Sequence, residues 1–124
     1  MNDNRPVNLD IGTMRLPITA WASISHRASG VFLFVGMAVL LWAFDASLSS
    51  PEGFASVGEA LSSPLAKLVI WAIVAGLIYH SLAGIKHLVM DFGIGETMEG
   101  GEMGAKIVIG LSVVLTLAAG AWIW

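Results

Sequence analysis

Three long uncharged segments dominate the chain and limit what it can fold into. The first lies between Arg27 and Asp45 and holds 17 residues, the second lies between Lys67 and Lys86 and holds 18, and the third covers 107–124. A helix needs about 20 apolar residues, within a range of about 17–25, to cross the hydrocarbon core of a bilayer. Because unpaired strands cannot cross lipid, the sequence predicts an all-α integral membrane protein with spans at about 22–45, 64–88 and 104–124.

The composition supports a membrane protein and excludes several classes of function. Hydrophobic residues make up 56% of the 124 residues and charged residues only 12%, whereas soluble domains carry about 25% charged residues. The chain has no cysteine, so disulfides, iron–sulfur ligation by this chain and covalent haem attachment are excluded. The net charge is −3, and without a basic patch we expect no nucleic-acid partner. We expect residues 1–124 to form a single membrane-anchor domain.

The segments between the spans predict loops, and their charges predict an orientation. Residues 45–64 are rich in serine, glycine and proline, and residues 91–105 carry five glycines and four acids. Cations precede the first span, whereas the first loop holds acids and no cation before Lys67. The positive-inside rule therefore places the N-terminus in the cytoplasm and the C-terminus outside. The cations used here are Arg5, Arg15 and Arg27.

This orientation brings all three histidines to the same half of the membrane. His26 and Arg27 stand at the start of the first span, and His80 and His87 stand toward the end of the second. Ionisable groups inside a membrane are candidates for function by default. We therefore expect the functional site at the cytoplasmic side.

His80 is the candidate ligand of a haem iron. At about 100° per residue, Gly76, His80, Gly84, His87 and Asp91 share one helix face. A glycine one turn before and one turn after His80 would open a slot for a flat ligand, and neutral imidazole is a common ligand of haem iron. In the alternative, the glycines serve helix packing and His80 donates a hydrogen bond across a helix pair. Spacing alone leaves both interpretations open.

Depth along the helices assigns different roles to the other polar residues. His80 precedes Lys86 by six residues and is expected about 9 Å deeper in the membrane, while His87 lies about 10 Å along the helix from His80. His87 and His26 are therefore expected at the wrong depth for the opposing axial position. A sixth iron ligand is then expected from another chain, and His26, Arg27, Lys86 and His87 are expected near the haem propionates.

The first span also carries a candidate quinone site. Ser23, His26, Arg27, Gly30 and Phe34 share one helix face. The hydroxyl of Ser23 and the guanidinium of Arg27 could donate hydrogen bonds to the carbonyl oxygen of a lipid-soluble quinone. Alternatively, Ser23 bonds its own helix backbone and Arg27 extends to phosphate head groups.

Four motifs in these segments resemble a known family. They are RPVNLD at 5–10, SISHRASG at 23–30, SSPEGF at 49–54 and HSLAGIKHLVMDFG at 80–93. The chain resembles the cytochrome b membrane-anchor subunit of bacterial succinate dehydrogenase, respiratory complex II, over nearly its whole length. The second and fourth motifs are the most specific for that family.

The resemblance implies a cofactor, partners and a role in electron transfer. One haem b would be shared with a second small anchor subunit, with His80 as the axial ligand from this chain and His26, Arg27 and His87 around the propionates. Ser23 and Arg27 would line the ubiquinone site beside the iron–sulfur subunit. Succinate would be oxidised on a flavoprotein subunit, so this chain would not be catalytic alone. Lys86 departs from the arginine of many relatives, which puts a propionate contact there in doubt.

The resemblance also implies a location, and other classes of function remain open. The chain would be a multi-pass protein of the bacterial inner membrane with a periplasmic C-terminus, and its three helices would form half of a haem-binding bundle. One alternative is a purely structural anchor of a respiratory complex without cofactor. Another is a helper subunit of a transporter.

Overall fold

The computed structural model describes residues 9–124, which are helical apart from short connections and contain no strand. A short 3-10 turn, η1 (Ile11–Thr13), precedes α1 (Ile18–Ser49), α2 (Pro51–Leu61), α3 (Pro64–Asp91) and α4 (Met98–Ile123). Arg5 and the first part of the RPVNLD motif lie outside the described residues.

Three of these helices are long and apolar enough to cross a membrane, namely α1, α3 and α4. The prediction of an all-helical membrane protein with three spanning helices is thereby confirmed. With 32 residues, α1 is about 48 Å long and exceeds a hydrocarbon core of about 30 Å. The helices therefore run past the predicted spans at several ends.

The first predicted loop is largely helical, which differs from the expectation for residues 45–64. Helix α1 continues to Ser49, and α2 follows after a single residue. Ser50 accepts a hydrogen bond from Gly53 N, and Pro51 occupies the first turn. Serine at the N-cap followed by proline favours a helix start. The Ser-Ser-Pro pattern is therefore a helix signal here, and so is the second copy that begins α3.

The second connection is a true turn. Gly93 and Gly95 have φ values of +84° and +70°, a region that residues with a Cβ rarely adopt. Gly93 N donates to Met90 O at 2.9 Å, which closes the end of α3. Thr97 then caps α4 by accepting from Gly100 N, so α4 starts within the segment expected to be a loop, 91–105.

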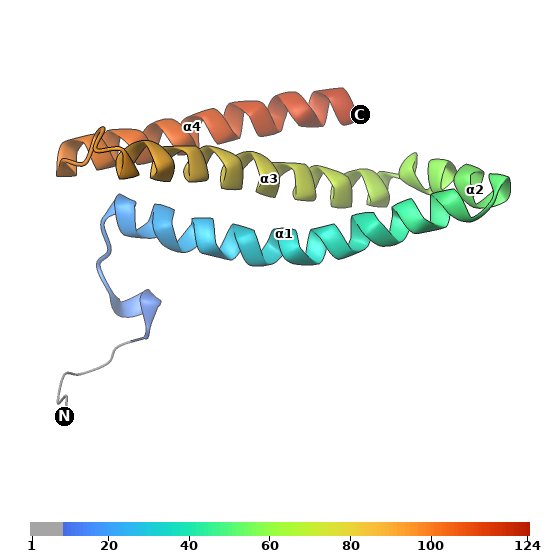
Figure 1. Cartoon of the computed structure of the whole chain (residues 1–124), viewed down its shortest axis with the longest axis horizontal. Coiled ribbons are helices and arrows are strands. Elements are labelled where there is room, and N and C mark those ends of the chain that lie inside the picture. Colours follow the sequence, from blue (N-terminus) through green and yellow to red (C-terminus); the bar gives the residue numbers. More distant parts are fainter. Residues whose placement is uncertain (1–8) are drawn as a thin grey trace.

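The long helices lie side by side, with α3 packed against both α1 and α4 (Figure 1). Large side chains of one helix fill places where a neighbour has only glycine. A Cβ on Gly36 would stand 3.3–3.6 Å from Ile73, and one on Gly120 would stand 2.8–3.0 Å from Trp71. Small residues permit this close approach, because association in lipid depends on packing.

The bundle has two unlike ends. The start of α1, the end of α3 and the start of α4 meet at one end, which we call the histidine end, and α2 covers the other, which we call the α2 end (Figure 1). The chain exposes many large apolar side chains along the helices between these ends. Such a surface is expected for helices that face lipid or partner helices.

Candidate functional site

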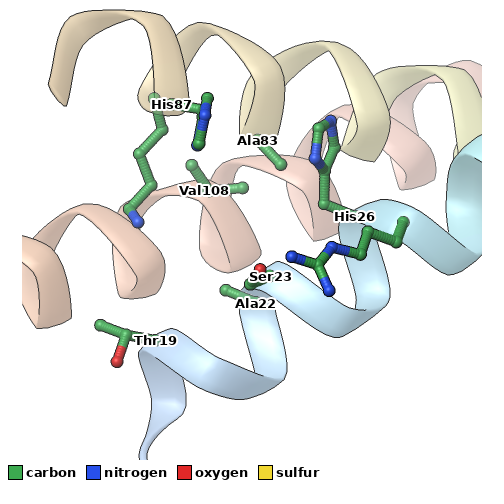
Figure 2. Close-up of a pocket in the computed structure, with 9 residues that line it drawn as sticks. Thr19, Ala22, Ser23, His26, Ala83, His87 and Val108 are labelled. Atoms are coloured by element: carbon green, nitrogen blue, oxygen red, sulfur yellow. The ribbon is translucent and has the colours of Figure 1, made fainter. Parts of the chain in front are cut away.

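A polar pocket opens between α1, α3 and α4 at the histidine end (Figure 2). Its volume is about 290 Å³. Helix α1 contributes three polar residues that were expected at the site from the sequence, together with Thr19, which was not, and α3 contributes one lysine and one histidine. The lining residues are Thr19, Ala22, Ser23, His26, Arg27, Ala83, Lys86, His87 and Val108.

The pocket has a positive character. Arg27 and Lys86 line it together with two imidazoles, and no carboxylate is among its lining residues. Outside the lining, Oδ2 of Asp91 lies 3.7 Å from Nε2 of His87, with both side chains mostly exposed. An exposed pair of this kind contributes little. The pocket therefore suits an anionic group or a carbonyl oxygen.

Lys86 reaches the pocket along a groove in α4. A Cβ on Gly104 would stand 3.0 Å from Cε and 3.5 Å from Cδ of Lys86. The lysine stem therefore lies where α4 has no side chain. Because Gly104 has no side chain, the stem of Lys86 packs against the backbone of α4. The sequence alone does not show this contact.

Ser23 has a free hydroxyl, unlike its neighbours on α1. Ser25 donates to Trp21 O at 2.6 Å, and Ser29 donates to His26 O at 2.6 Å. Within residues 9–124, the structure gives Ser23 no hydrogen bond. The alternative in which Ser23 bonds its own backbone is therefore not what the structure shows, and the hydroxyl is open to a ligand.

His80 lies beside this pocket, half-buried between α3 and α1. Its Nδ1 is 2.9 Å from Oγ of Ser29 and 3.3 Å from the backbone oxygen of His26. The rings of His26 and His80 stack with centroids 4.4 Å apart and an interplanar angle of 25°. In the described part of the chain, Nε2 of His80 has no hydrogen-bond partner.

The expected difference in depth between His26 and His80 is wrong. The estimate used Arg27 and Lys86 as markers of the same membrane level on two helices. The stacked rings instead place the two imidazoles beside one another. The rings still face one another rather than pointing from opposite sides at one atom, so His26 and His80 do not form an axial pair in this arrangement.

The two glycines around His80 do not form an open slot. A Cβ on Gly76 would stand 2.8 Å from the ring of Phe32, and one on Gly84 would stand 3.6 Å from Nε2 of His26. Both notches are therefore filled by side chains of α1. The packing role that the sequence left open is the one the structure shows for these glycines.

Two residues around His80, Ser29 and Tyr79, were not expected from the sequence, and Gly30 was expected on the quinone face rather than beside His80. Ser29 bonds the imidazole, Gly30 leaves room for it, and Tyr79 links α3 to α1 through Ala22 O at 3.1 Å and through Oγ of Ser25. Ser29 follows His26 by three residues, a spacing that places both on one side of a helix. That spacing was the available signal.

The fold and this pocket define an all-helical membrane protein with a polar site at one end of its helix bundle. Over residues 1–119, the sequence matches the family described as succinate dehydrogenase/fumarate reductase transmembrane subunit. The chain belongs to this family. The resemblance to cytochrome b membrane anchors of succinate dehydrogenase, non-catalytic subunits of that complex, is thereby confirmed.

Named relatives cover the chain almost completely. The succinate dehydrogenase cytochrome b556 subunit of Coxiella burnetii is 36% identical, with 100% of both chains covered. The cytochrome b556 subunit of Paracoccus denitrificans is 33% identical, with 92% of this chain and 88% of the relative covered. The mitochondrial cytochrome b560 subunit of Sus scrofa is 31% identical, with 98% and 73% covered.

Proposed function

We propose that this chain is the haem b- and quinone-binding anchor of a succinate:ubiquinone oxidoreductase of the bacterial inner membrane. One observation carries the proposal: the fold gathers His80, a positive pocket and a free serine hydroxyl at one end of the bundle. Its partners would be a second small anchor subunit, an iron–sulfur subunit and a flavoprotein subunit. Support comes from the family membership and from this juxtaposition.

The residues present fit a haem. His80 offers a single imidazole whose Nδ1 is occupied and whose Nε2 is free in the described chain. One imidazole suits an iron already held by a porphyrin, with a second ligand from the other anchor. Arg27, His26 and His87 would hold the propionates, and Lys86 stands in the same pocket. When bound, the haem would supply a one-electron redox centre.

Ser23 and Arg27 would bind the quinone. The serine hydroxyl and the guanidinium would donate hydrogen bonds to one quinone carbonyl oxygen, which would orient the ring and polarise that oxygen. Reduction places negative charge on the oxygen, so a cationic donor stabilises the charge as it develops. Electrons would arrive from the iron–sulfur subunit, and the anchor would contribute position and proton-donating groups.

Cofactor analysis tests the haem assignment. We expect the purified complex to show a low-spin b-type absorption spectrum that is lost in His80→Ala. His87→Ala is the comparison variant, because His87 lies two turns along α3 and is mostly exposed. Its loss would remove a propionate contact but no iron ligand, so we expect it to keep a b-type spectrum. A b-type spectrum unchanged in His80→Ala would contradict the assignment, and a complex without any haem would favour a purely structural anchor.

Enzyme assays test the quinone site. We expect Ser23→Ala to lower quinone reduction about 5- to 10-fold and Arg27→Leu about 10- to 100-fold, the effect of losing a neutral and a charged hydrogen bond. Reduction of an artificial dye at the flavoprotein should persist in both variants. Equal loss of both activities would point to failed assembly instead, and unchanged quinone reduction would contradict the site.

The orientation is testable because the chain has no cysteine of its own. We expect a cysteine introduced at Arg15 or at Glu96 to react with a membrane-impermeant thiol reagent from the cytoplasmic side. A cysteine at Glu52 in α2 should react from the periplasmic side. Labelling of positions 15 and 96 from opposite sides would contradict the proposed topology and, with it, the proposed site.

A further inference from the structure

We infer that Ser29 is a positioning residue that keeps the proton of His80 on Nδ1 and so presents Nε2 as the ligating nitrogen, an inference that rests on the proposed haem function. The contact that carries it is the distance of 2.9 Å between Oγ of Ser29 and Nδ1 of His80. Ser29 was not among the site residues expected from the sequence. Neither the match to the family nor the names of the relatives assigns it a role.

The direction of the proton follows from counting donors. A serine hydroxyl has one proton, and Ser29 directs it to the backbone oxygen of His26 at 2.6 Å. Toward His80 the same oxygen can then only accept. The second neighbour of Nδ1 is again the His26 carbonyl oxygen, at 3.3 Å, which also can only accept. Two acceptors around Nδ1 require that Nδ1 carry the hydrogen, so a neutral ring keeps its lone pair on Nε2.

The ring is also confined mechanically by the same stretch of α1. The His26 ring covers one face of His80 with centroids 4.4 Å apart. Gly30 stands at its edge, where a Cβ would come within 3.2 Å of Cε1. His26, Ser29 and Gly30 therefore form a cradle on one side of α1 that sets the plane and the rotation of the imidazole. This cradle gives a common role to three residues of the SISHRASG motif, which recur at helical spacing along α1.

Such a partner changes the chemistry of a ligating imidazole. Donation from Nδ1–H to an oxygen raises the basicity of the ligating nitrogen and fixes the orientation of the ring, and loss of such a partner typically weakens metal binding about 10- to 100-fold. A more basic imidazole favours the ferric state. Removal of the Ser29 hydroxyl should therefore weaken haem retention and raise the reduction potential of the haem.

The test compares two serines of α1 that make the same local bond but differ in whether a histidine lies beside them. Ser47 donates to Phe44 O at 2.6 Å, the same local bond that Ser29 makes to His26 O, but contacts no histidine. In the purified complex, we expect Ser29→Ala to lower haem retention about 10-fold, to raise the potential and to shift the ferric electron paramagnetic resonance signal. Ser47→Ala should match the wild type, and Ser29→Thr, which keeps a hydroxyl, should restore wild-type values.

The outcomes separate this inference from the function on which it rests. Suppose that the wild-type complex shows a b-type spectrum and that His80→Ala loses it. If haem retention, reduction potential and resonance signal are then unchanged in Ser29→Ala, the role of Ser29 alone is overturned. A wild-type complex without haem would overturn both. If Ser29→Ala fails to assemble, Ser29→Cys keeps the size with a weaker hydrogen-bonding group, and we expect it to change the potential in the same direction. An unchanged potential in that variant would overturn the inference.

Discussion

The interface between α1 and α3 uses serine in opposite ways at its two ends. At the histidine end, Ser25 contacts the Tyr79 hydroxyl and Ser29 contacts His80, so hydroxyls connect the two helices. Toward the α2 end, Ser47 and Ser49 donate to Phe44 O and Ala46 O of their own helix. The same residue type therefore orients a site where a partner faces it and is satisfied locally where none does.

The two ends also differ in what fills their glycine notches. At the histidine end, Gly30 and Gly84 admit imidazole rings, whereas Gly36 and Gly120 admit an isoleucine and a tryptophan. The Gly30 notch bears on the orientation of His80, whereas the other three notches permit close packing of the helices. The comparison shows that the role of a glycine in a membrane helix depends on which side chain of the neighbouring helix occupies the space beside it.

The largest expected effect comes from filling a notch at the histidine end. Gly30→Val places carbon atoms against Cε1 of His80, where even a Cβ would stand at 3.2 Å. We expect haem content to fall at least about 10-fold in the assembled complex, because the imidazole must leave its position. Gly110→Val is the control, since a Cβ there meets nothing of this chain within 4 Å. Full haem content in Gly30→Val would show that the cradle does not set the ring.

A smaller effect is expected from the polar links between helices at the two ends. Trp71 Nε1 donates to Thr116 O at 2.8 Å and its ring fills the Gly120 notch. The Tyr79 hydroxyl bonds Ala22 O at 3.1 Å and Oγ of Ser25 but fills no notch. We expect Trp71→Phe to destabilise by about 2 kcal/mol through lost packing and a lost bond.

For the tyrosine, Tyr79→Phe removes the hydroxyl alone and should cost about 1 kcal/mol, because it loses two bonds to α1 and such bonds between membrane helices average about 0.6 kcal/mol each. Thermal dissociation of the detergent-solubilised complex measures both variants. A larger loss in Tyr79→Phe than in Trp71→Phe would reverse the comparison and would give the histidine end the greater share of stability.

The smallest effect is expected where a serine hydroxyl neither links two helices nor bonds its own helix. Ser112 on α4 is only 6% exposed, and its Oγ has no hydrogen-bond partner in the described chain. Removing an unsatisfied buried hydroxyl, so that only the methyl group of alanine remains, is neutral or stabilising. We expect Ser112→Ala to change stability by less than about 1 kcal/mol, toward greater stability, in the same dissociation assay. Clear destabilisation would reveal a partner for Ser112 from another subunit or from buried water.

Four residues of the candidate pocket could be named from the sequence, but the contacts between them could not. Ser23, His26, Arg27 and His87 were expected together, and the structure places all four in one pocket. Their roles toward haem and quinone stay predictions. Ser29 escaped notice because a serine inside a span normally bonds its own backbone, and only the position of α3 gives it a second partner.

By itself, the sequence determined the number of spans and the gathering of the ionisable residues toward one end of them. Both depend on local hydropathy and on charge counting along the chain, because the cost of placing a polar group in lipid is paid residue by residue. The tertiary structure decided how α1 and α3 are aligned, and therefore that His26 stacks on His80 and Ser29 bonds it. Helix alignment depends on which side chain enters which notch, a non-local fit that no charge in the sequence marks.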